Sequence, residues 1–161
     1  MTKILIIEDE ESIRRVLRKV LSEESKNYKI LEAIDGLQAI ETVKSNKIDL
    51  ILCDIKMPKI DGIEVLQFLV KDFPEIPVIM ISGHGDLETA VESMRLGAFD
   101  YISKPPDLNR LLNSVRSASK NNVFRKKSRT ILKKSKDFKI IGESVLIIEI
   151  NNIIEKVAKT D

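Results

Sequence analysis

The feature that most constrains the fold is a short apolar run, Leu50 to Cys53, that ends at a single carboxylate, Asp54. Met57-Pro58 breaks the pattern three residues later. So short an apolar run before a proline is typical of a buried strand in a parallel sheet rather than of a helix. Asp54 would then stand at the carboxyl end of its strand, the edge at which open α/β sheets bind ligands. Because an isolated buried carboxylate is costly, other charged groups should converge on it.

Three further apolar runs also end in polar residues, and they cover about residues 3–7, 78–81 and 99–103. The carboxyl ends of parallel strands share one edge of a sheet, so the residues that follow these runs should lie near Asp54. Those residues are Glu8, Asp9, Ser82 and Lys104. The sequence therefore predicts a site made of carboxylates, a hydroxyl group and an ammonium group.

Amphipathic segments separate the apolar runs. We expect helices over 11–24, from 36, from 62, over 86–96 and from 108, with a further strand over 28–33. Strands that alternate with helices indicate a doubly wound α/β fold, with five parallel strands covered on both faces. The expected strand order is the flavodoxin-like 2-1-3-4-5. The apolar residues expected to face the core are Ile13, Val16, Leu17, Val20 and Leu21 in the first helix, and Leu87, Ala90, Val91 and Met94 in the fourth.

These motifs, in this order, resemble the receiver domain of bacterial two-component response regulators over about residues 2 to 120. The resemblance implies that Asp54 accepts a phosphoryl group and that Lys104 neutralises charge on it. It also implies a Mg²⁺ site, with Asp9, Asp54 and the backbone carbonyl of Lys56 as ligands and Glu8 acting through a water. Many receivers have aspartate where this chain has Glu8.

The resemblance also implies a switch. Ser82 would bond the phosphoryl group, the ring of Tyr101 would fill the vacated space, and the face made by the fourth helix, fifth strand and fifth helix would change. The Lys104-Pro105 bond is expected to be cis. The implied partners are a sensor histidine kinase and a second copy of the chain, in the cytoplasm and without a membrane segment.

The composition changes near residue 120, which divides an acidic part of the chain from a basic one. We expect a receiver domain over 1–120, a basic linker over 121–138 and a fragment over 139–161. That fragment resembles the start of the AAA+ ATPase domain of sigma-54-dependent activators. Together with the 82–85 run, it resembles the nitrogen-regulation (NtrX/NtrC) branch. Sigma-54 RNA polymerase and DNA would then be reached only through domains missing from this chain.

No Gly-x-x-x-x-Gly-Lys-Ser/Thr loop occurs in the sequence, so we do not expect an ATPase or another enzyme, and we expect no nucleotide cofactor. A haloacid-dehalogenase-like phosphatase also uses an aspartyl nucleophile after a strand, but it needs a second aspartate where this chain has Lys56. Nucleic-acid binding by the basic stretch 120–139 is a further alternative. Since that stretch has few aromatic residues, a solvated linker is favoured.

Overall fold

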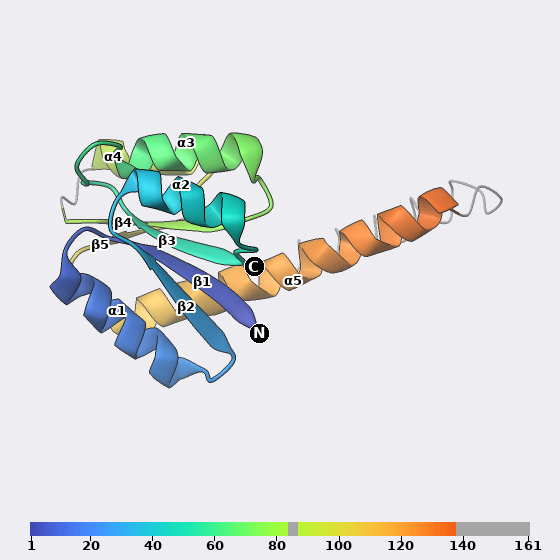
Figure 1. Ribbon diagram of the computed structural model, residues 1–161, viewed down its shortest axis with the longest axis horizontal. Helices are drawn as coiled ribbons and strands as arrows, with labels where there is room; N and C mark the ends of the chain where they lie inside the picture. The colour runs from blue at the N-terminus through green and yellow to red at the C-terminus, as the bar shows by residue number, and fades with distance from the viewer. Residues whose placement is uncertain (84–86, 138–161) are drawn as a thin grey trace. The chain divides into compact units, whose positions relative to one another are not determined.

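The computed structural model of the protein describes residues 1–83 and 87–137, with side chains up to residue 122. Our expectations for 139–161 and for residues 84–86 lie outside these ranges. Strands and helices alternate along the described chain (Figure 1). Their bounds are β1 Thr2–Ile7, α1 Glu11–Glu24, β2 Tyr28–Ala33, α2 Gly36–Ser45, β3 Leu50–Asp54, α3 Gly62–Asp72, β4 Val78–Ser82, α4 Leu87–Leu96, β5 Asp100–Ser103 and α5 Leu108–Asp137.

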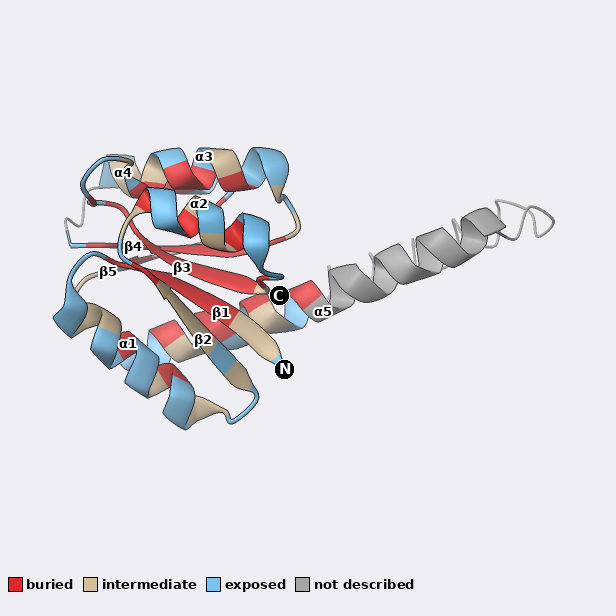
Figure 2. Cartoon of the chain, viewed as in Figure 1, coloured by how far each residue is buried: buried red, intermediate tan, exposed pale blue. Residues whose placement is uncertain are grey.

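The five strands form one parallel sheet in the order β2-β1-β3-β4-β5. This confirms the predicted fold class and strand order. Every residue of β3 and β4 is buried, as Figure 2 shows for the centre of the sheet. Since helices cover both faces of the sheet, its central strands can be apolar at every position rather than at alternate ones.

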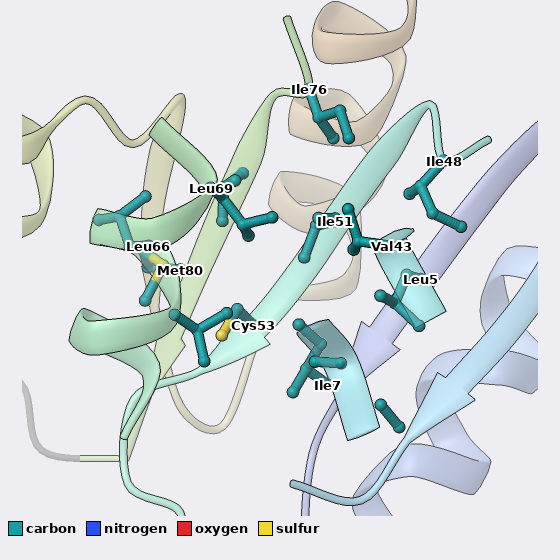
Figure 3. Close-up of a cluster of buried hydrophobic side chains, with 14 of the residues drawn as sticks. Leu5, Ile7, Val43, Ile48, Ile51, Cys53, Leu66, Leu69, Ile76 and Met80 are labelled. Carbon is teal, nitrogen blue, oxygen red and sulfur yellow. The ribbon is translucent and has the colours of Figure 1, made fainter. Parts of the chain in front are cut away.

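Helix α1 and the part of α5 up to Val123 lie on one face of the sheet, and α2, α3 and α4 lie on the other (Figure 1). Successive strand side chains point to opposite faces, so each strand supplies both layers. Leu5, Ile7 and Cys53 pack beneath α2 and α3, as Figure 3 shows. Ile6 and Leu52, one position along, pack against α1 and α5 instead. The two apolar layers hold the strand ends that carry the polar residues in a fixed register.

The first and fourth helices depart from the predicted core pattern. Val16 on α1 is exposed, although Leu17 and Leu21 are buried as expected. On α4 the prediction was wrong for three large residues, since Leu87, Val91 and Met94 are 77%, 46% and 47% exposed.

A face of smaller residues packs inward on α4 instead. Ser93 is fully buried, and its hydroxyl tolerates burial because it donates a hydrogen bond to the carbonyl of Thr89 at 2.8 Å. Gly97 follows the last residue of the helix with a positive φ of 111°, the conformation in which glycine commonly terminates helices. There it lies close to Val70 of α3, whose Cγ2 would be 3.2 Å from an added Cβ. Small residues thus let α4 approach α3 closely, and its large apolar side chains face outward.

Helix α5 continues past two consecutive asparagines, Asn121 and Asn122. Asn122 is buried, and its side-chain amide donates to the carbonyl of Asp49 at 2.5 Å. Asp49 in turn precedes β3, and its carboxylate accepts from the backbone N–H of Lys3 in β1. Asn122 therefore fastens α5 to the amino end of the sheet. A compact unit covers Met1–Val123.

Candidate functional site

The site lies at the carboxyl ends of four neighbouring strands. Ile7 of β1 pairs with Cys53 of β3, so the next residues along the two chain segments, Glu8 and Asp54, lie side by side. Asp54 pairs with Ile81 of β4, which places Ser82 one position further along the next strand. Ser82 pairs with Ser103 of β5, and the backbone N–H of Lys104 donates to the Ser82 carbonyl at 2.7 Å. The register of the sheet therefore brings together residues that are far apart in the sequence.

Three carboxyl groups form a cluster at this edge. One oxygen from each of Glu8, Asp9 and Asp54 lies within 4.8 Å of the others. Glu8 is 1% exposed and Asp54 is 5% exposed, whereas Asp9 is open to solvent. The cluster thus combines two buried carboxyl groups with one that faces water.

Lys104 bridges the two buried carboxyl groups. Its Nζ lies 2.7 Å from Oε2 of Glu8 and 3.1 Å from Oδ1 of Asp54. The other oxygen of Glu8, Oε1, accepts from the backbone N–H of Glu10 at 3.2 Å. The Lys104-Pro105 peptide bond is cis, as the sequence led us to expect. The ammonium group is therefore shared between the carboxylates at the ends of β1 and β3.

Burial sets the electrostatics of the site. Desolvation raises the pKa of Asp54 and of Glu8 above the ordinary values of 3.8 and 4.5, although hydrogen bonds from Lys104 work in the opposite direction. Burial alone would lower the pKa of Lys104, but its hydrogen bond to Glu8 and its attraction to both carboxylates raise it overall. The site is therefore short of positive charge, because one ammonium group faces three carboxyl groups.

The remaining residues that the sequence singled out lie around this cluster. Ser82 is buried at the end of β4, and Tyr101 is half-buried on β5, where it packs against the core beneath α2 and α3. Lys56 is exposed in the loop after Asp54. The structure thus places all of them at the same end of the sheet or on the strand next to it.

Sequence reasoning missed two residues at the site. Arg14 on α1 donates from Nη1 to the carbonyl of Glu8 at 2.9 Å. Gly62, the first residue of α3, packs directly on the backbone of Asp54, and its N–H donates to the carbonyl of Ile55 at 2.7 Å. An Asp-Gly pair signals a helix start, but no pattern shows which backbone the glycine touches.

The donor set fits a hard divalent cation. Mg²⁺ prefers carboxylate, carbonyl and water oxygens, and it commonly takes one or two carboxylates while keeping several waters. The exposed Asp9 leaves the cluster open to water, and the two buried carboxyl groups share a single ammonium group, that of Lys104. The fold and the site define a class of protein: a doubly wound α/β domain with a buried carboxylate, a lysine and an acidic cluster at the carboxyl ends of its strands.

Comparison with known proteins identifies the family. The response regulator receiver domain matches residues 4–116 of this chain. The chain therefore belongs to the response regulator receiver domain family. Among solved structures, it resembles the receiver domain of NtrX from Brucella abortus, with 36% identity, a TM-score of 0.68, and coverage of 73% of this chain and 98% of that one.

Curated relatives extend the likeness over nearly the whole chain. NtrX of Azorhizobium caulinodans is 31% identical over 160 residues, which is 98% of this chain and 35% of the relative. An NtrX-like response regulator of Rickettsia typhi is 35% identical over 98% of this chain and 33% of the relative. The DNA-binding transcriptional regulator NtrC of Escherichia coli is 29% identical, again over 98% of this chain and 33% of the relative. The chain thus spans about a third of the length of these NtrX- and NtrC-like regulators.

Among the helices of residues 1–83 and 87–137, none is long and apolar enough to cross a bilayer.

Proposed function

We propose that this chain accepts a phosphoryl group on Asp54 from a phosphohistidine of a partner sensor histidine kinase. The observation that carries the proposal is the position of the Asp54 carboxylate, which lies at the strand edge within 3.1 Å of Lys104 and within the three-carboxylate cluster. Family membership supports it, because receiver domains are the phosphoacceptors of two-component systems.

In the proposed reaction an Asp54 carboxylate oxygen attacks the phosphorus of the donor. The new P–O bond forms an acyl phosphate while the P–N bond to the donor imidazole breaks, and the imidazole leaves with the electron pair. Lys104 moves its ammonium group from the Asp54 oxygen to the incoming phosphoryl oxygens, where it stabilises the charge that develops. The negative charge of the phosphoryl group on Asp54 would thus lie next to the ammonium group of Lys104.

We also propose how the acidic cluster holds the metal. Asp9, Asp54 and the backbone carbonyl of Lys56 would bind Mg²⁺, and Glu8 would act through a coordinated water. When bound, Mg²⁺ neutralises charge on the phosphoryl oxygens and on the cluster. The salt bridge of Glu8 to Lys104 at 2.7 Å supports an indirect role for Glu8, since one of its oxygens is already engaged.

The readout would use Ser82 and Tyr101. The Ser82 hydroxyl would bond a phosphoryl oxygen, and the ring of Tyr101 would turn inward to fill the space that is vacated. The burial of Ser82 beside Lys104 and the half-buried position of Tyr101 support this pair. The outcome would be a change in the face formed by α4, β5 and α5.

We propose that this face pairs two copies of the chain. The exposed apolar residues Leu87, Val91 and Met94 on α4 supply a surface for such a contact. In a full-length regulator, output would follow through sigma-54 RNA polymerase and DNA, reached by other domains, and the regulated genes would concern nitrogen use. Light scattering with and without beryllofluoride and Mg²⁺ tests the pairing, and a monomer in both conditions at high micromolar concentration refutes it.

Intact mass spectrometry tests the phosphoacceptor. Incubation with acetyl phosphate and Mg²⁺ should add one phosphoryl group to the wild type and none to Asp54→Asn, and chelation of the metal should abolish the gain. Asp61→Asn is the matched control, because an asparagine oxygen can still accept the 2.9 Å hydrogen bond from the Glu64 N–H. Labelling of Asp54→Asn at the wild-type level would overturn the assignment.

A further inference from the structure

Arg14 holds the backbone of the acidic loop between β1 and α1. Its Nη1 donates to the carbonyl of Glu8 at 2.9 Å and lies 3.4 Å from the carbonyl of Asp9. One guanidinium nitrogen therefore spans the two consecutive residues whose carboxyl groups belong to the cluster. The contact runs from the end of the first turn of α1 back to the loop, across five and six residues of sequence.

The loop before α1 lacks the side-chain helix cap that the loops before α2 and α3 have. Asp35 and Asp61 cap α2 and α3 by accepting from backbone N–H groups at 2.8 and 2.9 Å. Glu10 occupies the same position before α1, but its side chain makes no capping hydrogen bond. Without such a cap, the loop depends on other contacts for its conformation. Arg14 provides two of them from within the helix, in addition to the hydrogen bond from the Glu8 N–H to the Ala33 carbonyl and that from the Glu10 N–H to the Glu8 carboxylate.

Arg14 is well suited to this work because it acts on carbonyl oxygens rather than on carboxylates. Lys104 already occupies Oε2 of Glu8, and the Glu10 N–H occupies Oε1. A cation that bound the carboxyl groups directly would compete with a metal ion for them. Arg14 can instead fix the direction in which the Glu8 and Asp9 side chains leave the backbone, and it adds no competitor for their carboxylate oxygens.

We propose that Arg14 is a positioning residue that orients Glu8 and Asp9 for a divalent cation. This inference rests on the metal site of the proposed function and adds a residue to it. Partners that orient metal ligands typically contribute about 10- to 100-fold to metal affinity. Because the metal itself attracts both carboxylates, we place Arg14 at the lower end of that range.

The decisive variant is Arg14→Lys, which keeps the charge but shortens the side chain by one bond. The lysine ammonium would end where the guanidinium carbon lies, too far from the Glu8 carbonyl for a hydrogen bond of normal length. Arg15→Lys is the matched control on the same helix, because Arg15 is exposed and, among the described residues, its side chain bonds only Glu11, at 2.8 Å. Both variants keep the net charge of the protein.

Mg²⁺ binding should be measured by isothermal titration calorimetry without a phosphodonor, together with urea unfolding in chelator. We expect about tenfold weaker binding for Arg14→Lys and unchanged binding for Arg15→Lys, with both variants fully folded. The amide resonances of Glu8, Asp9 and Glu10 should shift only in Arg14→Lys. Equal affinity in wild type and Arg14→Lys overturns the positioning role and leaves the metal site standing. If the wild type itself binds no Mg²⁺, the metal site fails, and the role of Arg14 fails with it.

Discussion

Gly62 is the position at which a single methyl group should do most damage to the site. An ideal Cβ added there would lie 2.1 Å from the carbonyl oxygen of Asp54, 2.7 Å from Cα of Ile55 and 2.9 Å from the carbonyl carbon of Asp54. Ordinary contacts begin at 3.4 Å. All three atoms belong to the backbone, so no rotation of a side chain can relieve the clash.

Two effects of Gly62→Ala oppose each other. A glycine-to-alanine change at a helix position stabilises by about 0.4–1 kcal/mol, mainly by restricting the unfolded chain. Overpacking costs about 1–3 kcal/mol and occasionally more. Here the 2.7 Å hydrogen bond from the Gly62 N–H to the Ile55 carbonyl holds the two backbones together, so the overpacking cost should lie at the upper end. We expect a net loss of about 2–3 kcal/mol.

Urea unfolding followed by circular dichroism measures this loss, and a thermal scan should show the melting temperature falling by roughly 10 °C. Gly83→Ala is the control, because the nearest atom to its added Cβ is Cδ of Lys104 at 3.8 Å. Its stability should change by no more than about 0.5 kcal/mol. If Gly62→Ala is as stable as the wild type, the inference that α3 lies too close to the Asp54 backbone to accept a methyl group is refuted.

The same variant should also impair the proposed chemistry. Relief of the clash requires the Asp54 backbone to move, and a misplacement of about 1 Å can slow a reaction by about 100-fold. Phosphoryl uptake from acetyl phosphate, measured by intact mass at a temperature where the variant is folded, should therefore fall by at least about tenfold. Gly83→Ala creates no such backbone clash, and it is a control for stability but not for phosphoryl uptake.

Three further variants test the charges and hydrogen bonds of the domain. Asp54→Asn should raise the free energy of unfolding by about 1 kcal/mol at pH 7 in chelator. The pKa of Asp54 is raised in the folded protein, so folding opposes ionisation of this carboxyl group, and asparagine removes that penalty. The gain should vanish as the pH falls towards 3.8, where the carboxyl group is protonated in both states. Lys104→Met should lower stability by about 3 kcal/mol, since it leaves two buried carboxylates without their cation, and Mg²⁺ should restore part of it. Asn122→Ala should cost about 1–3 kcal/mol through loss of its bond to the Asp49 carbonyl, whereas the exposed neighbour in Asn121→Ala should change little. Urea titrations measure the free energy of unfolding of all three variants. An unchanged stability of Lys104→Met or of Asn122→Ala, or a loss of stability in Asp54→Asn, would contradict the corresponding prediction.

The strands and the site could be predicted because each depends on a local pattern. The apolar run before Asp54 is buried at every position, and α1 has the predicted bounds Glu11–Glu24. Once the strand order is known, the convergence of Glu8, Asp54 and Lys104 follows from sheet geometry alone. The metal ligands, the phosphoacceptor and the switch remain predictions that rest on the family.

The face that α4 buries could not be predicted, because a helix of this length offers two plausible apolar faces. Large residues at 87, 91 and 94 suggested one face, but the buried Ser93 satisfies its own hydroxyl within the helix and permits a closer approach. Arg14 and Asn122 escaped prediction for a different reason. Each donates to a backbone carbonyl, and every residue carries a carbonyl, so the sequence does not mark the acceptor.

The distance in sequence between Glu8 and Lys104, which are 96 residues apart, has a consequence for the newly made chain. Parallel strands pair only after the intervening segments have been closed into loops, so such pairings form late in folding. The last strand of the site, β5, leaves the ribosome after the other four, and α5 follows it. Until then the acidic loop has no lysine partner, because Lys104 directly follows β5. A chain made only as far as β4 would therefore hold its two buried carboxyl groups without the ammonium group that bridges them, and the charges of the site are paired only when the sheet is complete.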